Sequence, residues 1–466
     1  MLLKNSAIYL ITSLIPAIAG FLLVPFYLKY ISVEEFGYLS VILMINTFIT
    51  IFATMQLHSS IVKYFLEYKD DKDKQKRYLS SLLFFSVFIS ILFAFGIYIL
   101  FDYLKSFFEL DNLSNNIIVL GVSIAFINGF KVFFESINRI LQHSKDILVS
   151  NIISTFILAI VAFILLYFYQ FKLDSIVIAM LLSSIFGLIY YIFLNKSYIV
   201  FTFDFSLIKE PIRFAIALIP HTLSKNIYVM ADRLILVKFV SMGDVGIYAI
   251  IDKIANIVKL LTSNFGKAFT PYFMNKQKNN ETENITNLIL FTNYFFLGIL
   301  LGLSLFINLI ISFVESTIIN YAYLVIILST AFIFKNLEMY LTNFLLDNKQ
   351  TKYISIISFS AAILNIVLNL IFIPKYGIIA ATVTTTISYF IGFLVAYYFV
   401  DIKFKYIKLP ILKLIQDFIF VSILVVLVYF NQNLYGVGLL GLYLIYGYFN
   451  YFKIIKNSLL KEKNEK

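Results

Sequence analysis

Runs of about twenty apolar residues recur along the whole chain, separated by short charged or turn-rich breaks. Each run is long enough to cross the hydrocarbon core of a bilayer as a helix, because a helix rises about 1.5 Å per residue. The pattern therefore predicts an all-α polytopic membrane protein with about fourteen transmembrane helices. The predicted spans are 8–30, 38–60, 79–103, 115–139, 147–169, 174–194, 212–239, 246–269, 285–312, 318–346, 353–373, 378–400, 411–430 and 434–451.

The composition excludes several other classes of protein. Only 14% of the 466 residues are charged and 61% are hydrophobic, which leaves too little polar surface for a water-soluble domain. The chain has no cysteine and only three histidines, which argues against disulfides, thiol catalysis and a zinc site. We therefore expect no metal site and no cofactor.

The net charge of +11 could indicate nucleic-acid binding, but the basic residues are unevenly placed. Twenty-six of the 37 lie in connections on the side of the N-terminus or in the two chain ends, five lie in the opposite connections, and six lie within predicted spans. Basic loops stay on the cytoplasmic side of a membrane. The distribution predicts that both termini are cytoplasmic, and it leaves nucleic-acid binding without support.

Two halves of the sequence resemble each other. The segment "SLIP" (13–16) returns as "ALIP" (217–220), "KYISVEEFGYLSV" (29–41) as "KFVSMGDVGIYAI" (238–250), and "LQHSKDILVS" (141–150) weakly as "LDNKQTKYIS" (346–355). The separations are 204, 209 and 205 residues, about six predicted spans. Six is an even number, so both halves have the same orientation, as in transporters whose parallel repeats enclose a substrate. We expect Gly37 and Gly246 to open matching helices after tight turns.

The repeat predicts a domain organisation of four parts. Residues 1–200 form one six-helix lobe and residues 201–402 form a second, in a pseudo-twofold arrangement about a central cavity. Residues 403–454 supply two additional helices, and residues 455–466 form a basic cytoplasmic tail.

Ionisable residues inside the predicted spans fall on single helix faces, at spacings of three, four and seven residues. One such stripe lies in the seventh span and another in the eighth, and shorter ones lie in the fourth and tenth. Lys131 and Lys335 are 204 residues apart, so the repeat places them as symmetry mates near the middle of their helices. The stripes contain Lys131, Glu135, Lys225, Asp232, Arg233, Asp252, Asn256, Lys259, Lys335 and Glu338, with Lys253 beside them.

Charges in a membrane are costly and usually paired or functional. One interpretation is that Lys131–Glu135 and Lys335–Glu338 are self-neutralising pairs in a packed bundle. The other is a water-filled cavity lined by these faces. Six of the ten charged residues are basic, so such a cavity favours an anion, and lysine and arginine bind phosphate well.

The two sets of candidate residues follow from charge. The candidates for binding a diphosphate or glycan are Lys131, Lys225, Arg233, Lys253, Lys259, Lys335 and Asn256. The candidates for coupling transport to H⁺ or Na⁺ are Asp232, Asp252, Glu135 and Glu338.

Four segments resemble a known family. They are "FLLVPFYLKYISVEEFGYLSV", "SSIVKYFLEYKDDKDKQKRYLSS", "FAIALIPHTLSKNIYVMADRLILVKF" and "LNLIFIPKYGIIAATVTTTISYF". They are similar to the polysaccharide-transporter family of the multidrug/oligosaccharidyl-lipid/polysaccharide (MOP) flippase superfamily, and most of all to its O-antigen flippases. The resemblance implies two six-helix lobes and translocation of an undecaprenyl-diphosphate-linked oligosaccharide from the cytoplasmic to the outer leaflet of the bacterial inner membrane. It also implies coupling to an ion gradient.

The sequence departs from the related lipid II flippases, which place arginines in their first two helices. Here the interior polar residues of those spans are Ser13, Asn46 and Gln56. A drug exporter of the same superfamily is an alternative, but a protein that binds cationic drugs requires an acidic, aromatic-lined pocket rather than a basic one. A membrane-embedded glycan polymerase or ligase is less favoured, because the outer connections are short and no nucleophile and base stand together. We expect a transporter and not an enzyme.

Overall fold

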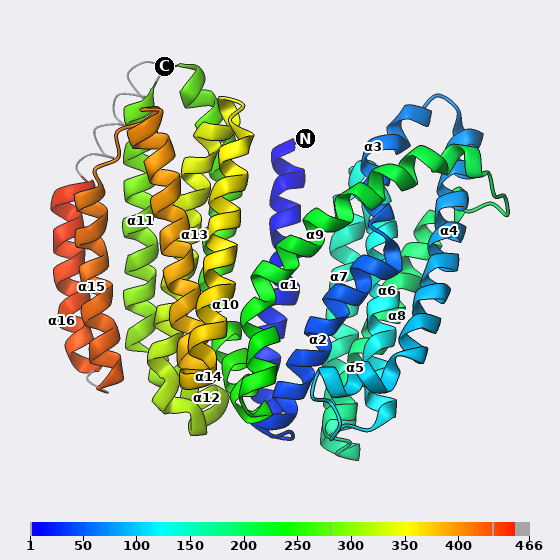
Figure 1. Ribbon diagram of the computed structural model, residues 1–466, viewed down its shortest axis with the longest axis horizontal. Coiled ribbons are helices and arrows are strands. Elements are labelled where there is room, and N and C mark those ends of the chain that lie inside the picture. Colours follow the sequence, from blue (N-terminus) through cyan, green and yellow to red (C-terminus); the bar gives the residue numbers. More distant parts are fainter. Residues whose placement is uncertain (1, 280, 431–432, 453–466) are drawn as a thin grey trace. The chain divides into compact units, whose positions relative to one another are not determined.

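The computed structural model describes residues 2–279, 281–430 and 433–452 (Figure 1). Every regular element within these ranges is a helix, so the predicted all-α class is confirmed. The chain divides into two compact units, Met1–Gly246 and Ile247–Lys466. The predicted tail at 455–466 lies outside the described residues.

The first unit contains nine helices and the start of a tenth. Their bounds are α1 Leu2–Leu28, α2 Val33–Thr54, α3 Leu57–Tyr64, α4 Lys72–Ile99, α5 Phe101–Phe107, α6 Asn115–Ile140, α7 Ser144–Ile164, α8 Leu173–Asn195 and α9 Phe205–Phe239. Helix α8 packs against both α6 and α7, α2 packs against α6, and α1 packs against α7. Helix α9 packs against α2, α3 and α4, so it is an integral part of this unit.

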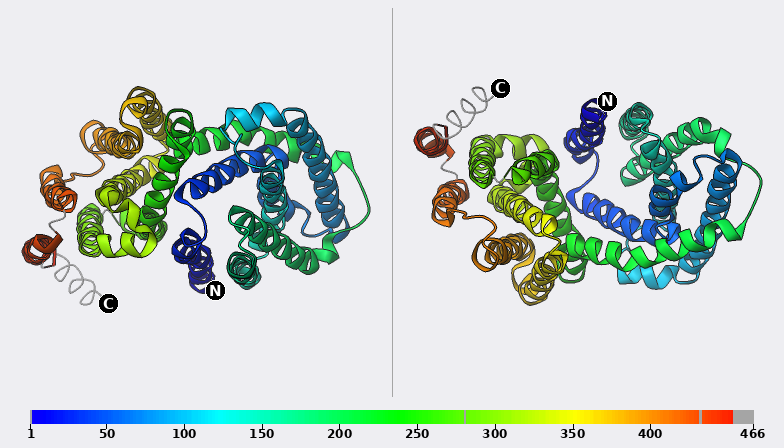
Figure 2. Two further views of the ribbon diagram at one scale, coloured as in Figure 1. Left: turned by 90° about the horizontal axis from the view of Figure 1, so that it is seen from below. Right: turned by 90° about the horizontal axis from the view of Figure 1, so that it is seen from above.

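The second unit holds most of the tenth helix and six more. Their bounds are α10 Met242–Lys278, α11 Thr282–Leu305, α12 Ile307–Glu315, α13 Ala322–Asp347, α14 Thr351–Tyr397, α15 Ile411–Tyr429 and α16 Asn433–Gly447. Helices α13 and α14 form the most extensive pairing, and α15 and α16 pack against α11 (Figure 2). The predicted division at residue 200 differs from the division into compact units at residue 246 and stays a prediction.

All fourteen predicted spans fall on helices, and nine helical segments among the described residues are long and apolar enough to cross a membrane. The chain is therefore a multi-pass membrane protein, while the count of fourteen crossings stays a prediction. Helices α9 and α10, of 35 and 37 residues, are absent from the nine. Their polar stripes lower their hydropathy, and these stripes carry most of the candidate site residues.

The eleventh and twelfth predicted spans form one continuous helix, α14, that is interrupted at Gly377. This glycine has φ 55° and ψ −132°, a conformation that only glycine adopts without strain, and Pro374 stands three residues before it. A buried polar network joins the two halves of α14. Asn365 donates to Thr385 at 3.3 Å, Asn369 donates to Asn365 at 3.2 Å, and Thr384 donates to Asn369.

The repeat is visible most clearly in α6 and α13. Each helix has 26 residues, and both their first and their last residues are 207 positions apart. Each ends in the same turn, in which Gln142 (φ 58°) and Lys349 (φ 56°) adopt the left-handed conformation. The following amide donates five residues back in both turns, at 2.8 and 2.7 Å.

This equivalence corrects the predicted pairing of the two lysines. A separation of 207 residues places Lys131 opposite Glu338, whereas Lys335 stands three residues, or about 4.5 Å, nearer the start of its helix. The weak match at "LQHSKDILVS" was therefore out of register by two residues.

The strongest sequence match corresponds to two identically built helix starts. Ser32 caps α2 by accepting from the Glu35 amide at 3.1 Å, and Ser241 accepts from the Asp244 amide at 3.1 Å. Gly37 lies four residues inside α2, and Gly246 lies four residues inside α10, so neither opens its helix as predicted.

Close approach of two backbones explains these glycines instead. A Cβ on Gly37 would lie 2.0 Å from the Met242 carbonyl oxygen, and a Cβ on Gly246 would lie 1.9 Å from that of Val33. The contact is reciprocal, because the two glycines, like the two carbonyls, are 209 residues apart.

Candidate functional site

The predicted site residues lie on four helices. Lys131 and Glu135 are on α6, and Lys225, Asp232 and Arg233 are on α9. Asp252, Lys253, Asn256 and Lys259 are on α10, and Lys335 and Glu338 are on α13. Three of the eleven, Lys259, Lys335 and Glu338, line one cavity, which lies entirely within the second unit.

This cavity has a volume of about 310 Å³ and is lined by residues of α10, α13 and α14. Two aromatic rings in its wall, Phe332 and Tyr389, lie beside the lysines, with Lys259 Nζ 5.1 Å from the Phe332 centroid and Lys335 Nζ 5.7 Å from that of Tyr389. Such contacts stabilise an ammonium group where water is scarce. The polar residues that line the cavity are Lys259, Thr262, Ser263, Lys335, Asn336, Glu338, Thr342, Ser358 and Tyr389.

Lys335 and Glu338 form an ion pair at one wall of the cavity. Lys335 Nζ donates to Glu338 Oε1 at 2.7 Å, and their side chains are 37% and 4% exposed. The second carboxylate oxygen, Oε2, is buried and accepts no hydrogen bond from the described residues. Both side chains line the cavity, with the lysine partly exposed and the carboxylate almost fully buried. This confirms one of the two predicted self-neutralising pairs.

The other predicted pair, Lys131 with Glu135, does not form. Lys131 Nζ donates instead to Ser154 Oγ on α7 at 2.8 Å. Glu135 pairs with Arg139, one turn further along α6, at 2.5 Å. A Cβ on Gly187 of α8 would lie 2.9 Å from Lys131 Nζ, so this lysine is held in a niche between three helices.

The stripe on α9 passes from an exposed end to a buried one. Lys225 is exposed, whereas Asp232 is only 8% exposed and accepts a hydrogen bond from the Arg233 amide at 2.9 Å. The stripe on α10 has an internal contact, in which Asn256 Nδ2 donates to Asp252 at 3.0 Å. Both stripes run along single helix faces, as the sequence predicts.

Sequence reasoning missed Asp417 of α15. This carboxylate is fully buried and accepts a hydrogen bond from Asn293 Nδ2 of α11 at 3.0 Å. Its signal was present, since it is the only acidic residue in the 19-residue run "ILKLIQDFIFVSILVVLVY". A buried intramembrane carboxylate with an amide partner fixes α15 against α11.

Two carboxylates outside the spans have perturbed pKa values. The hydrogen bond from Lys276, followed by one from Asn284, lowers the pKa of Glu281. The hydroxyl of Ser206 lowers the pKa of Asp204, which caps the start of α9. Both groups stabilise helix ends in their ionised form.

Comparisons with solved structures identify the fold. The chain is similar to the lipid II flippase MurJ in its inward closed conformation, with TM-score 0.77 and 17% identity over 96% of this chain and 99% of that one. The chain is also similar to a MATE-family multidrug resistance transporter of the MOP superfamily in its inward-facing conformation. For this pair the TM-score is 0.64 and the identity is 12%, over 89% of this chain and 95% of that one. With a MATE transporter from Vibrio cholerae, the TM-score is 0.56 and the identity is 12%, over 85% of this chain and 94% of that one.

These identities establish a shared fold. The printed names of these three structures are those of a flippase and two transporters. No curated protein matches the chain. The model of a protein family described as "Polysaccharide biosynthesis protein" matches residues 2–277, more than half of the sequence. The chain therefore belongs to the polysaccharide biosynthesis protein family, and it has the fold of the MOP flippases and transporters.

Proposed function

We propose that this protein translocates an undecaprenyl-diphosphate-linked oligosaccharide, the repeat unit of O-antigen or a related surface polysaccharide, from the cytoplasmic to the outer leaflet of the bacterial inner membrane. The termini are then cytoplasmic, as the distribution of basic residues favours. The partners are this lipid-linked glycan and the surrounding lipids, and no cofactor is needed apart from a coupling ion.

The observation that carries the proposal is the cavity of the second unit, where Lys259 of α10 and Lys335 of α13 face a common space beside two membrane-spanning helices, α13 and α14. A charge at the centre of such a helix costs about 2.5–3.5 kcal/mol on insertion scales, so two lysines at one cavity need a reason. Glu338 balances only one of them. The net positive space suits a diphosphate, which can accept hydrogen bonds from both ammonium groups.

Glu338 gives the site a means of coupling. When the cavity holds no anion, Lys335 is paired with this carboxylate at 2.7 Å. A diphosphate that takes Lys335 as its partner leaves the carboxylate buried and without its ion partner, which is costly inside a membrane. Headgroup binding and a change in the surroundings of Glu338 are linked in this scheme, and Asp232 is the second coupling candidate because it is also buried.

The direct test removes the cavity charges without leaving one of them alone. We expect Lys259→Ala, and separately the double substitution Lys335→Met with Glu338→Gln, to abolish surface glycan while the protein remains in the membrane. Lipid-linked repeat units should accumulate in the same cells. The matched control is Lys352→Ala, an exposed lysine at the start of α14. Normal glycan in both cavity variants would reject this cavity as the headgroup site.

Two further variants test the contribution of α9. Alanine at Lys225 and at Arg233 should each abolish surface glycan if these residues contact the diphosphate. Coupling is tested by ion-gradient-dependent uptake of the lipid-linked glycan in proteoliposomes that contain Asp232→Asn or Glu338→Gln. Unaltered dependence on the gradient in both variants would exclude these carboxylates. Export of cationic drugs, with glycan unaffected by loss of the protein, would favour the drug-exporter alternative.

A further inference from the structure

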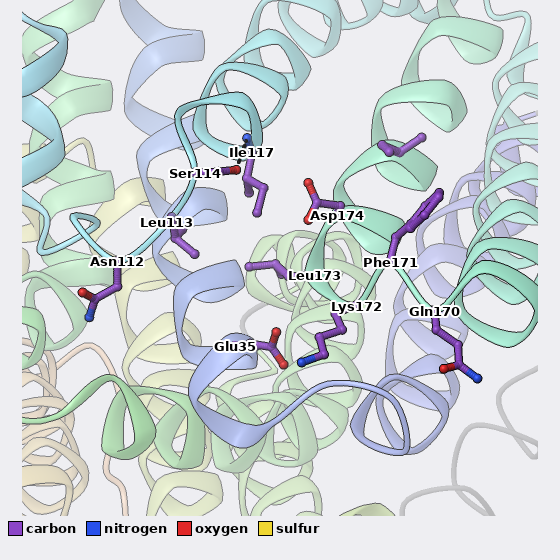
Figure 3. Close-up of a pocket in the computed structure, with 11 residues that line it drawn as sticks. Glu35, Asn112, Leu113, Ser114, Ile117, Gln170, Phe171, Lys172, Leu173 and Asp174 are labelled. Atoms are coloured by element: carbon purple, nitrogen blue, oxygen red, sulfur yellow. Dashed lines mark hydrogen bonds between the residues drawn. The ribbon is translucent and has the colours of Figure 1, made fainter.

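A second polar cavity lies within the first unit, and its lining residues are far along the chain from Lys259 and Lys335. It has a volume of about 530 Å³ and is placed where α2, α6 and α8 begin (Figure 3). Its lining combines two parts. Apolar side chains form one part, from Leu113, Ile117, Leu173 and Ile178. Charged and amide side chains form the other, from Glu35, Lys172, Asp174, Asn112 and Gln170.

Charges of both signs share this cavity without neutralising each other. Figure 3 shows Glu35, Lys172 and Asp174 directed into the same space from two helix starts. No ion pair joins them among the described residues. Lys172 is held there by an unusual backbone, with φ 49° and ψ −126°, two residues after Gln170 with φ 53°. L-residues rarely adopt such conformations, so the short connection before α8 is built to present this side chain.

The cavity lies at the level where a membrane meets water. Helices α6 and α8, whose first residues line it, are both apolar enough to span, so the cavity is at the boundary of the membrane-crossing part. Beside it, the segment that joins α7 to α8 carries three exposed aromatic rings, Tyr167 at 54%, Phe168 at 68% and Tyr169 at 60%. Aromatic belts of this kind mark the headgroup region.

The charge pattern selects among ligands. Two carboxylates and one lysine give the lining a net charge of −1, which disfavours an anion, and the ammonium group of Lys172 leaves hydrogen-bond donors that an inorganic cation cannot use. A molecule with an ammonium group and a phosphate close together matches both signs, since carboxylates accept hydrogen bonds from an ammonium group and lysine binds phosphate. We propose that this cavity binds the headgroup of a zwitterionic phospholipid with a primary ammonium group, phosphatidylethanolamine, with its glycerol region against Leu173 and Ile178.

A choline headgroup provides the sharpest comparison. Phosphatidylcholine has the same net charge and phosphate, but its quaternary ammonium has no N–H to donate to Glu35 or Asp174. The proposed site therefore prefers phosphatidylethanolamine over phosphatidylcholine, whereas a merely lipid-wetted surface does not distinguish them. This inference does not depend on the proposed transport function, and its test does not use transport.

The chain contains no tryptophan, so Phe171→Trp places a single fluorescent reporter at the cavity rim. The protein is placed in phosphatidylglycerol nanodiscs with rising fractions of phosphatidylethanolamine or phosphatidylcholine. We expect a saturable change in the emission of the introduced tryptophan with the first lipid only. Phe201→Trp, at an exposed position outside the two cavities described above, is the matched control and should respond to neither lipid.

Two substitutions tie the signal to the carboxylates. Glu35→Gln with Asp174→Asn should raise the half-saturating fraction of phosphatidylethanolamine at least tenfold. Glutamine at position 35 can still accept the hydrogen bond from the Ser32 amide, which measures 2.8 Å, so the helix cap is kept. Native mass spectrometry of the chain with its natural residues provides a second measurement, in which phosphatidylethanolamine should be retained in preference to phosphatidylcholine.

Equal responses to the two lipids, or an unchanged response in the double variant, would overturn the assignment. So would a change in the emission of the Phe171→Trp reporter caused by millimolar N-acetylglucosamine in nanodiscs without phosphatidylethanolamine, because the cavity would then be a saccharide site.

Discussion

Lys131 of α6 and Glu338 of α13 occupy the same place in two helices of equal length, each sixteen residues after the first helical residue. Their surroundings also correspond. Lys131 lies against Gly187 and donates to Ser154, and Glu338 lies against Gly392, where an added Cβ would also meet Ala361. The two niches are therefore repeats of one another that hold opposite charges.

The difference shows how the two halves have diverged. The small residue that admits the side chain is glycine in both niches, so the backbone packing is kept. The first unit satisfies its lysine with a neutral hydroxyl, Ser154 Oγ at 2.8 Å. The second satisfies its carboxylate with Lys335, one turn earlier on the same helix, and this lysine is what gives the second unit a charged cavity wall.

The largest expected effect is at the place where the two repeats remain alike. Gly37→Ala or Gly246→Ala drives a methyl group into a carbonyl oxygen that cannot rotate away, so each should destabilise the protein by about 3 kcal/mol. Thermal unfolding of the purified protein measures this. The two variants should lose similar stability, and the double variant should lose less than the sum, because both act on one contact. Full additivity would show that the contact is not shared.

The next largest effect is the loss of stability when the lysine of each niche is replaced, which should differ between the two niches. Lys335→Ala leaves Glu338 buried without its ion partner and should cost about 2 kcal/mol, less than for a fully buried pair because Lys335 is 37% exposed. Lys131→Met removes a lysine that donates to a neutral hydroxyl and should cost about 1 kcal/mol. Adding Glu338→Gln to Lys335→Ala should restore most of the loss. Absence of any restoration would contradict the pairing.

A smaller effect tests the glycines of the niches. Gly392→Ala places a Cβ 2.8 Å from Glu338 Oε2, and Gly187→Ala places one 2.5 Å from Ser154 Oγ, so each should cost about 1 kcal/mol. Ser154→Ala should relieve the second substitution, and Glu338→Ala should relieve the first. A double-mutant cycle in thermal unfolding measures this relief. If the second substitution restores stability in one niche and not in the other, the two niches are not structurally equivalent.

The smallest effect lies in a connection outside the niches. Because Lys276 lowers the pKa of Glu281 below its usual value of 4.5, the folded state favours the ionised carboxylate. This contribution is complete above the unfolded pKa and is lost as the pH falls through the lower folded pKa. The melting temperature of Glu281→Gln should therefore be lower than that of the natural chain near neutral pH, and the difference should shrink as the pH falls below the usual value and through the lowered pKa of Glu281. A difference that stays constant throughout the acid titration would show that the carboxylate charge is not responsible.

The helices were predictable because each predicted span is an apolar run between polar breaks, a signal that depends on length and hydropathy and needs no knowledge of the neighbouring helices. Equivalence within the repeat was less predictable. Lys131 and Lys335 share a residue type and a plausible separation, yet the left-handed turns at Gln142 and Lys349 set a register three residues different. Side-chain identity differs between the two halves, whereas the turn geometry is the same.

The site was predictable only in part. Helical spacing placed Lys335 beside Glu338, since residues three apart share a face. The same rule suggested Lys131 with Glu135, but their partners are Ser154 and Arg139, and Ser154 comes from another helix. Asp417 was missed because its partner, Asn293, lies 124 residues away. The spacing of residues along one helix predicts which of them share a face, but it does not predict contacts with another helix.

The turns at Gln142 and Lys349, which follow α6 and α13, are positions where a substitution should raise the thermal stability of the protein. Both residues hold a left-handed backbone that costs an ordinary side chain about 1 kcal/mol and costs glycine almost nothing. Glycine at both positions would therefore yield a more heat-resistant preparation for purification and imaging, with every lysine and carboxylate of the cavities left as it is.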